Sequence, residues 1–460
     1  MERRGHPAAI VIEALRSLRE LALPLIIAIV IGAGASAPSR GLVLGLLGLA
    51  IGIVTGIARW WTTTWWLDES ALRYRSGVFS PDETVIPRAR ISSLDTVQGP
   101  MQRLFGVVEL RVQTPGGGKH AEIALRAVTR RDAELLRRAL GHGAERPEAV
   151  DARLRLGLGA LLVAALTSPQ LGVLLPIAGA LGAAGEDLIE DVTPATFNGL
   201  PDTAGDWVVI VAAVLVLAWL LSFAGALVAF SGFEIIRDGD RLRIRTGLFA
   251  RRAATLPLSR VQGVRIVEGV LREPFGLAAL RVETAGYAGQ AAVTQTLFPL
   301  VSRREAAAII ASFVPALAVA LEPLEPAPPR ARRSYLTAPL LVALAAAVPI
   351  AAFLPRAWPA IPVLLAVLGG AGELRFRAAG WRLEGDLVVL RARHIARTTL
   401  VATTRRLQEH GTRRTPLQRR RRLADVTVAV GSGRRARVRH LDAGVADRLL
   451  GLLRGTAGGP

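Results

Sequence analysis

Residues 254–284, ATLPLSRVQGVRIVEGVLREPFGLAALRVET, repeat an earlier stretch of the same chain, residues 84–114, TVIPRARISSLDTVQGPMQRLFGVVELRVQT. Identical residues recur at a constant offset of 170 positions: Pro87 with Pro257, Arg90 with Arg260, Phe105 with Phe275 and Gly106 with Gly276. A third copy follows at an offset of 146 positions, where Arg260-Val261-Gln262 becomes Arg406-Leu407-Gln408. Because an internal repeat fixes the architecture of a chain, the protein is predicted to use one structural unit three times.

The order of features within the unit is specific. A short strand ends in Arg75-Ser76-Gly77-Val78-Phe79, and a Pro-x-x-Arg segment, an aromatic-Gly corner and a Leu-Arg-Val strand follow it. This order resembles the bacterial pleckstrin-homology domain of the YdbS/YdbT type. The resemblance implies three pleckstrin-homology-like β-barrels, each closed by a C-terminal helix and each preceded by a two-helix transmembrane hairpin. In the third copy, Arg421-Arg422 replace the Phe-Gly pair and Arg393 replaces the strand-end Gly.

The composition agrees with a membrane protein that carries basic domains. Hydrophobic residues make up 51% of the 460 residues, yet the net charge is +20, so apolar and basic residues must be segregated along the chain. The chain has no cysteine. This excludes disulfides, thiolate metal sites and a cysteine nucleophile.

Six runs without a charged residue are each predicted to cross the membrane as a helix. They are residues 21–39, 41–58, 156–184, 207–230, 334–355 and 357–372. Paired in order, they give three transmembrane hairpins, so the predicted fold class is membrane α-helical hairpins combined with α+β units. A signal peptide that ends at Ala37 is the alternative for the first run, and the following Pro38 disfavours cleavage there.

These features divide the chain into seven predicted segments. They are residues 1–58 (N-terminal segment and first hairpin), 59–141 (first domain), 153–230 (second hairpin), 231–314 (second domain), 315–333 (Pro-rich linker), 334–372 (third hairpin) and 373–455 (third domain).

The distribution of charge predicts the orientation. The loop at residues 185–206 carries acidic residues and no basic residue, whereas arginines flank the other ends of the predicted helices. Basic residues close to helix ends favour the cytoplasmic side. We therefore predict a multi-pass protein of the inner (plasma) membrane, with both termini and all three domains in the cytoplasm.

Catalytic and cofactor-binding motifs are not expected. Gly116-Gly117-Gly118-Lys119 lacks the spacing of a phosphate-binding loop, and His120 stands where Ser or Thr is required. The six histidines show no metal-ligand spacing. The predicted spans contain no ionisable residue, which argues against an ion-coupled transporter. We predict that the protein is not an enzyme and holds no metal or cofactor.

The third domain is the most basic part of the chain. Residues 373–460 contain 20 arginines and seven acidic residues. The candidate contact residues for anionic lipid headgroups or a protein partner are Arg413, Arg414, Arg419, Arg420, Arg421 and Arg422. An anionic leaflet would attract them, and a merely solvated basic face is the alternative. Nucleic acid is not expected as a partner, because aromatic residues for base stacking are not interleaved.

Three details of the repeat are also predicted. Thr129 and Asp442 are expected to cap the N-termini of the closing helices of the first and third domains, and Ser302 with Glu305 to form a capping box in the second. The rings of Phe105 and Phe275, at the same corner of the repeat, are expected to be buried.

The hypothesis from the sequence is a membrane-anchored scaffold that presents three cytoplasmic domains to protein partners. Contact with anionic lipid headgroups is a second role of the third domain. The alternative is a transport or export component in which six helices form a conduit.

Overall fold

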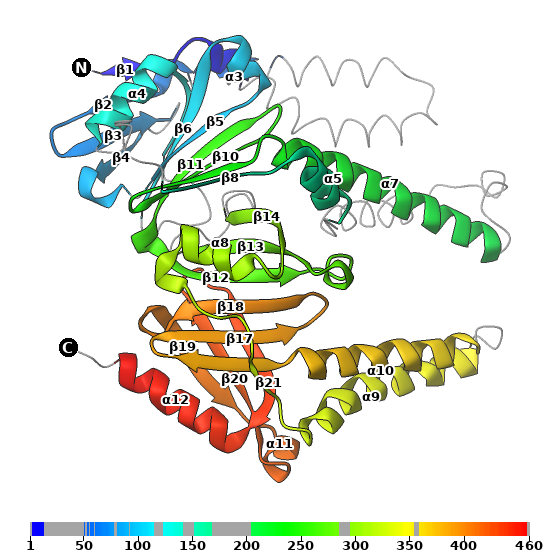
Figure 1. The fold of residues 1–460 in the computed structure, drawn as a ribbon. Coiled ribbons are helices and arrows are strands. Elements are labelled where there is room, and N and C mark those ends of the chain that lie inside the picture. Colours follow the sequence, from blue (N-terminus) through cyan, green and yellow to red (C-terminus); the bar gives the residue numbers. More distant parts are fainter. Residues whose placement is uncertain are drawn as a thin grey trace.

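The computed structural model describes residues 2–12, 60–77, 81–91, 93–114, 123–140, 151–167, 204–284, 295–353 and 358–457, together with a few positions between 50 and 58. Within these residues, each repeat consists of three antiparallel strands, three further antiparallel strands and a closing helix. The threefold repetition predicted from the sequence is therefore visible as three structural units (Figure 1).

The strands of the three repeats have these bounds. The first repeat contains β2 (Thr64–Leu67), β3 (Ala71–Ser76), β4 (Asp82–Pro87), β5 (Ser93–Gln98), β6 (Val107–Gln113) and β7 (Ile123–Thr129). The second contains β9 (Glu234–Asp238), β10 (Arg241–Thr246), β11 (Arg251–Pro257), β12 (Val261–Glu268), β13 (Leu277–Thr284) and β14 (Thr296–Ser302). The third contains β16 (Gly380–Glu384), β17 (Leu387–Arg393), β18 (Arg397–Thr403), β19 (Leu407–Arg413), β20 (Leu423–Val430) and β21 (Arg435–Asp442).

The remaining elements close or connect the repeats. The closing helices are α4 (Arg130–Ala139), α8 (Ala306–Phe313) and α12 (Ala443–Ala457). A short strand pairs beside the first strand of each repeat: β1 (Arg3–Arg4), β8 (Ala152–Arg155) and β15 (Glu325–Pro326). Two short helices, α3 (Pro100–Leu104) and α11 (Pro416–Arg420), lie in the turns after β5 and β19. The longer connecting helices are α5 (Leu158–Leu166), α7 (Ala204–Phe230), α9 (Ala331–Phe353) and α10 (Ala360–Ala378).

The sheets run across the boundaries between repeats. One seven-stranded sheet has the order β7-β6-β5-β11-β10-β9-β8, and the next has the order β14-β13-β12-β18-β17-β16-β15. The last three strands of one repeat thus join the first strands of the next. The prediction of three separate barrels is wrong for this reason: β5 pairs with β11, and β12 pairs with β18.

The hydrophobic cores follow the shared sheets. The core of the second repeat is built around Phe233, Leu242 and Leu280, and it also takes Val389 and Val401 from the third repeat. The third repeat packs its own core around residues such as Leu390 and Leu400 from the same two strands. Because alternate residues of a strand face opposite sides of the sheet, β17 and β18 contribute to two cores at once.

A glycine shapes the hairpin between β10 and β11. Gly247 has φ of +105°, and a Cβ placed on it would lie 2.1 Å from the carbonyl oxygen of Ala250. Neither the conformation nor the space admits another side chain. This explains the strand-end Gly of the repeat.

The predicted membrane architecture of three two-helix hairpins is also wrong. Among the described residues, one helix is long and apolar enough to cross a membrane, Ala331–Ala352 within α9, with a mean hydropathy of 2.0. Helix α5 has nine residues. In α7, the apolar stretch is the shorter Leu215–Phe230. The first predicted hairpin, residues 21–58, lies almost wholly outside the described residues.

Helix α10 shows a physical reason for the error. Its last turns carry Glu373, Arg375 and Arg377, and Glu373 forms ion pairs with Arg377 and with Arg332 of α9. The apolar part of this helix is therefore short. Helix α10 has 19 residues, but it includes the charged residues that follow the uncharged run, so its apolar part alone is too short to cross a membrane.

Candidate anion-binding site

Helix α9 is fixed to the third repeat at its N-terminal end. The ring of Tyr335 is buried, and its hydroxyl donates a hydrogen bond of 2.5 Å to the carbonyl oxygen of Arg439 in β21. The same ring packs edge-on against His440, with 4.8 Å between the ring centroids. The base of the one described helix that is long and apolar enough to cross a membrane is thus held against the most basic repeat.

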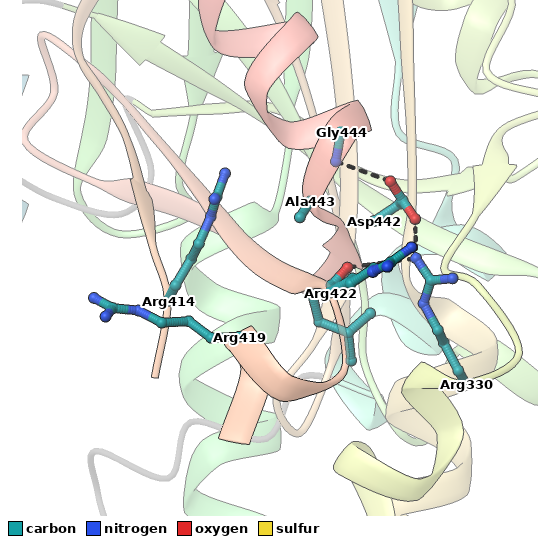
Figure 2. A pocket seen from close by; sticks show the side chains of 8 residues that line it. Arg330, Arg414, Arg419, Arg422, Asp442, Ala443 and Gly444 are labelled. Atoms are coloured by element: carbon teal, nitrogen blue, oxygen red, sulfur yellow. Dashed lines mark hydrogen bonds and ion pairs between the residues drawn. The ribbon is translucent and has the colours of Figure 1, made fainter. Parts of the chain in front are cut away.

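A cavity of about 390 Å³ opens next to this junction. Four arginines line it: Arg330 before α9, Arg414 after β19, Arg419 in α11 and Arg422 in the following turn. Asp442 at the end of β21 and Ala443 and Gly444 at the start of α12 also line it (Figure 2). We call this cavity the arginine pocket.

The arginine pocket carries an excess of positive charge. Arg330 forms an ion pair with Asp442, and Arg414 forms one with Asp447. No ion pair to a carboxylate is present for Arg419 or Arg422 within the part of the chain that the structure describes. Since guanidinium groups bind carboxylate and phosphate with several donors in one plane, the pocket is suited to an anion with several oxygen atoms.

The N-terminus of α12 is already occupied. The Asp442 carboxylate accepts hydrogen bonds from the backbone N–H of Gly444 at 2.9 Å and of Val445 at 3.4 Å, and the N–H of Ala443 donates to the carbonyl oxygen of Arg422. This confirms the predicted cap at Asp442. An anion in the pocket would therefore be held by guanidinium groups and not by the helix terminus.

Arg422 has an unusual backbone conformation. Its φ is +52°, and the residues at the same position of the first two repeats are Gly106 (φ +67°) and Gly276 (φ +63°). A left-handed conformation costs a residue with a side chain about 1–2 kcal/mol relative to glycine. The third repeat thus keeps the turn and places a charged side chain on it at a cost, which marks the position as a candidate for function.

The structure brings together three of the six arginines proposed from the sequence. Arg414, Arg419 and Arg422 line the arginine pocket. Arg421 instead donates a hydrogen bond of 2.9 Å to the hydroxyl of Ser334 at the start of α9. Arg413 ends strand β19, and Arg420 ends α11; neither lines the pocket. Sequence reasoning missed Arg330, which lies in the Pro-rich linker far from the arginine run.

The positions that recur between the first two repeats lie at the turns of the repeat. Pro87 and Pro257 end β4 and β11, and Arg90 and Arg260 lie in the single helical turns that follow. The prediction that the rings of Phe105 and Phe275 are buried is wrong. Phe105 is 38% exposed and Phe275 is 74% exposed, because both rings lie at the tip of a turn outside the core.

Exposed apolar side chains recur at turns next to the helices. The β12–β13 turn exposes Leu271 and Phe275, and Arg272 in the same turn donates hydrogen bonds of 3.0 Å to the Ala164 carbonyl and 2.9 Å to the Thr167 hydroxyl at the end of α5. Burial and the nearby Arg281 lower the pKa of Arg272 to about 10. This turn is thus docked on α5.

Two further turns of this kind also lie next to helices. The backbone N–H of Leu248, an exposed residue of the β10–β11 turn, donates to the carbonyl oxygen of Val228 in α7. Ile395 is exposed in the β17–β18 turn, where Arg375 of α10 donates to the His394 carbonyl. We call these three turns the helix-side turns.

Among the described residues, no group of three or more His, Asp or Glu side chains is placed to hold a metal ion. Two features of the described residues bear on function. The arginine pocket gathers positive charge, and the helix-side turns expose apolar side chains. The three-unit fold, the arginine pocket and α9 together define a protein with repeated domains beside a helix that is long and apolar enough to cross a membrane.

The chain belongs to a known family. It matches the family described as Bacterial PH domain over residues 11–144, 159–313 and 336–457. It is also similar to the UPF0699 transmembrane protein YdbT of Bacillus subtilis (strain 168), with 26% identity over 461 residues that cover 94% of this chain and 93% of the relative. The resemblance predicted from the sequence is confirmed. Neither the family description nor the name of the relative refers to a catalytic activity.

Proposed function

We propose that the protein is a membrane-anchored scaffold without enzymatic activity, whose third repeat binds the phosphate groups of anionic lipids in the arginine pocket. The observation that supports this proposal most directly is the position of the pocket. Arg330, which lines it, immediately precedes α9, and Arg421 beside it bonds Ser334 of α9. A lipid headgroup next to the base of a membrane helix would lie within reach of these guanidinium groups.

The helix-side turns support the same placement. Phe275, Leu248 and Ile395 are 74%, 47% and 66% exposed, and each lies in a turn that is hydrogen-bonded to α5, α7 or α10. An exposed apolar side chain is stabilised at the boundary between headgroups and acyl chains. We therefore place this edge of the sheets against the bilayer and the remaining surface of the repeats in water.

The first prediction concerns lipid binding by the arginine pocket. Replacing Arg414 and Arg419 by Gln in the full chain should weaken binding of phosphatidylglycerol by roughly 30-fold, since each arginine near an anionic surface contributes about 1 kcal/mol. Native mass spectrometry of the detergent-purified protein, titrated with phosphatidylglycerol or phosphatidylcholine, measures this directly. Binding of the neutral-headgroup lipid should not change.

A matched control replaces two arginines of the same repeat that lie outside the pocket. Arg405, paired with Asp386, and Arg382, paired with Glu384, are suitable. Their replacement by Gln removes the same charge and should leave phosphatidylglycerol binding within about twofold of the parent. Equal losses in both double variants would mean that only net charge matters, and the pocket would then have no specific role.

The second prediction concerns orientation. We propose that the repeats face the cytoplasm, as the distribution of arginine predicts. Because the chain has no cysteine, single cysteines at the exposed residues Asp240 and Arg434 report on the second and third repeats. Neither should react with a membrane-impermeant maleimide in intact cells, and both should react after permeabilisation. Labelling of either position in intact cells would show that the orientation is reversed.

A further inference from the structure

Two strands of the described sheets have an unpaired edge where other repeats have a partner. Among the described residues, β4 of the first repeat pairs only with β3 and ends the sheet β1-β2-β3-β4. Within the same part of the chain, β19 of the third repeat pairs only with β20 and begins the sheet β19-β20-β21. The strands at the same positions in the other repeats, β5, β11, β12 and β18, all pair across a repeat boundary.

The boundary pairing follows one rule within the chain. Between the first and second repeats, Gln98 lies opposite Arg251 and Thr96 opposite Ala253. Between the second and third repeats, Glu268 lies opposite Arg397 and Ile266 opposite Thr399. These positions are equivalent, because the strands match at the offsets of 170 and 146 that relate the repeats. The fourth strand of each repeat therefore joins the third strand of the next in a single register.

We propose that a second copy of this chain continues the rule, with β19 of one copy pairing antiparallel to β4 of the next. The same register places Arg413 opposite Asp82 of the second copy and Thr412 opposite Glu83 of the second copy. Extended backbone at a free edge is a template for such pairing. A basic residue thus meets an acidic one, at the position next to the one that corresponds to Glu268 and Arg397 inside the chain.

An exposed apolar side chain in β4 is consistent with a second chain as the neighbour of this strand. Val85 occupies the position in β4 that Val401 occupies in β18. Val401 is fully buried in the core of the preceding repeat, whereas Val85 is 46% exposed, since among the described strands none pairs with the free edge of β4. The third repeat of a second copy would supply that core.

The geometry also keeps the assembly beside one membrane. Helices α7, α9 and α10 extend from the sheets toward the same side of the molecule (Figure 1). If each copy is related to the next as one internal repeat is related to the following one, the helices of every copy lie on that side. The contact joins two different surfaces, so it produces a closed ring or an open row of copies.

The experiment uses two separately tagged full-length variants, Thr412→Cys and Glu83→Cys, in mild detergent. Residues directly opposite in an antiparallel pair have Cα atoms about 4.5–5.5 Å apart, which is within the range of a disulfide. Oxidation of the mixture should give a covalent heterodimer, and oxidation of either variant alone should give none. Covalent dimers of one variant alone, or none in the mixture, would overturn the proposal.

The register and the charge pair have their own controls. His410→Cys mixed with Glu83→Cys is two residues out of register and should give at least tenfold less heterodimer.

Arg413→Glu should lower the molar mass of the assembly measured by light scattering, and the further change Asp82→Arg should restore it. Both residues are exposed, so the fold should tolerate both changes. A double variant that stays dissociated would refute the pairing of Arg413 with Asp82. Lipid binding should be unaffected throughout, because Arg413 does not line the arginine pocket.

Discussion

Replacing Phe233 by Ala should lower the free energy of unfolding by about 3–5 kcal/mol, the usual cost of removing a fully buried aromatic ring. Phe233 is 1% exposed and is the largest fully buried side chain of the second repeat. Its ring packs edge-on against Phe298, with centroids 5.5 Å apart. Chemical denaturation of the detergent-purified chain, followed by circular dichroism of the strand signal, measures the change.

Phe275→Ala is the matched control for this prediction. The same ring is lost from the same repeat, yet Phe275 is 74% exposed. Its replacement should change the free energy of unfolding by less than about 1 kcal/mol. If the two variants were equally destabilised, the assignment of Phe233 to the core and of Phe275 to a surface turn would be incorrect.

The sequence was sufficient to predict the repeat and its order of strands and helix. The offsets of 170 and 146 residues reflect real structural equivalence, down to the turn where Gly106, Gly276 and Arg422 share a left-handed conformation. The helix start at Thr129 is confirmed, since the backbone N–H of Asp132 donates to its hydroxyl at 3.1 Å. The turn and the helix cap each involve residues that are close together in the chain, so the sequence alone is enough to predict them.

The capping box predicted at Ser302 shows how such signals fail. Helix α8 begins only at Ala306, and no side-chain hydrogen bond caps it. Ser302 is instead the last residue of β14, where it pairs with Leu277. The sheet extends into residues that the pattern assigned to the helix start, so tertiary pairing decided the boundary.

The sharing of sheets between repeats could not be predicted. Residues 399–402 of β18 are all buried, so both faces of this strand are covered. The run of apolar residues does not say which strand lies beside it. The burial of Val401 in the core of the second repeat and of Leu400 in that of the third follows only from the three-dimensional arrangement. The exposure of the Phe105 and Phe275 rings also depends on the three-dimensional arrangement and could not be predicted from the pattern.

The candidate site was predicted in part. The density of arginine after residue 413 pointed to Arg414, Arg419 and Arg422, which the structure gathers around one cavity. Arg330 joins them because the start of α9 packs against the turn after α11, and Arg330 donates a hydrogen bond of 3.4 Å to the Arg422 carbonyl. A contact between residues so far apart leaves no trace in composition or spacing.

Replacing Glu268 by Ala should also lower the free energy of unfolding by about 3 kcal/mol, the lower end of the cost of breaking a buried ion pair, because Arg397 keeps a second carboxylate, that of Glu273, at 3.3 Å. Glu268 is 2% exposed and ends β12, where Arg397 of the third repeat binds both of its carboxylate oxygens. Burial alone would lower the pKa of Arg397, but the hydrogen bond and charge of Glu268 raise it. The pair joins the second and third repeats, so denaturation should also lose cooperativity between them.

Two controls separate this ion pair from charge in general. Asp386→Ala removes a carboxylate from an exposed pair with Arg405 in the third repeat and should cost less than about 1 kcal/mol. The double change Glu268→Leu with Arg397→Met removes both buried charges and should recover most of the lost stability. In this double variant, Glu273 stays paired with Arg393, and Arg303 stays paired with Glu322. A Glu268→Ala variant within about 1 kcal/mol of the parent would show that the shared sheet alone, through the pairing of β12 with β18, holds the two repeats together.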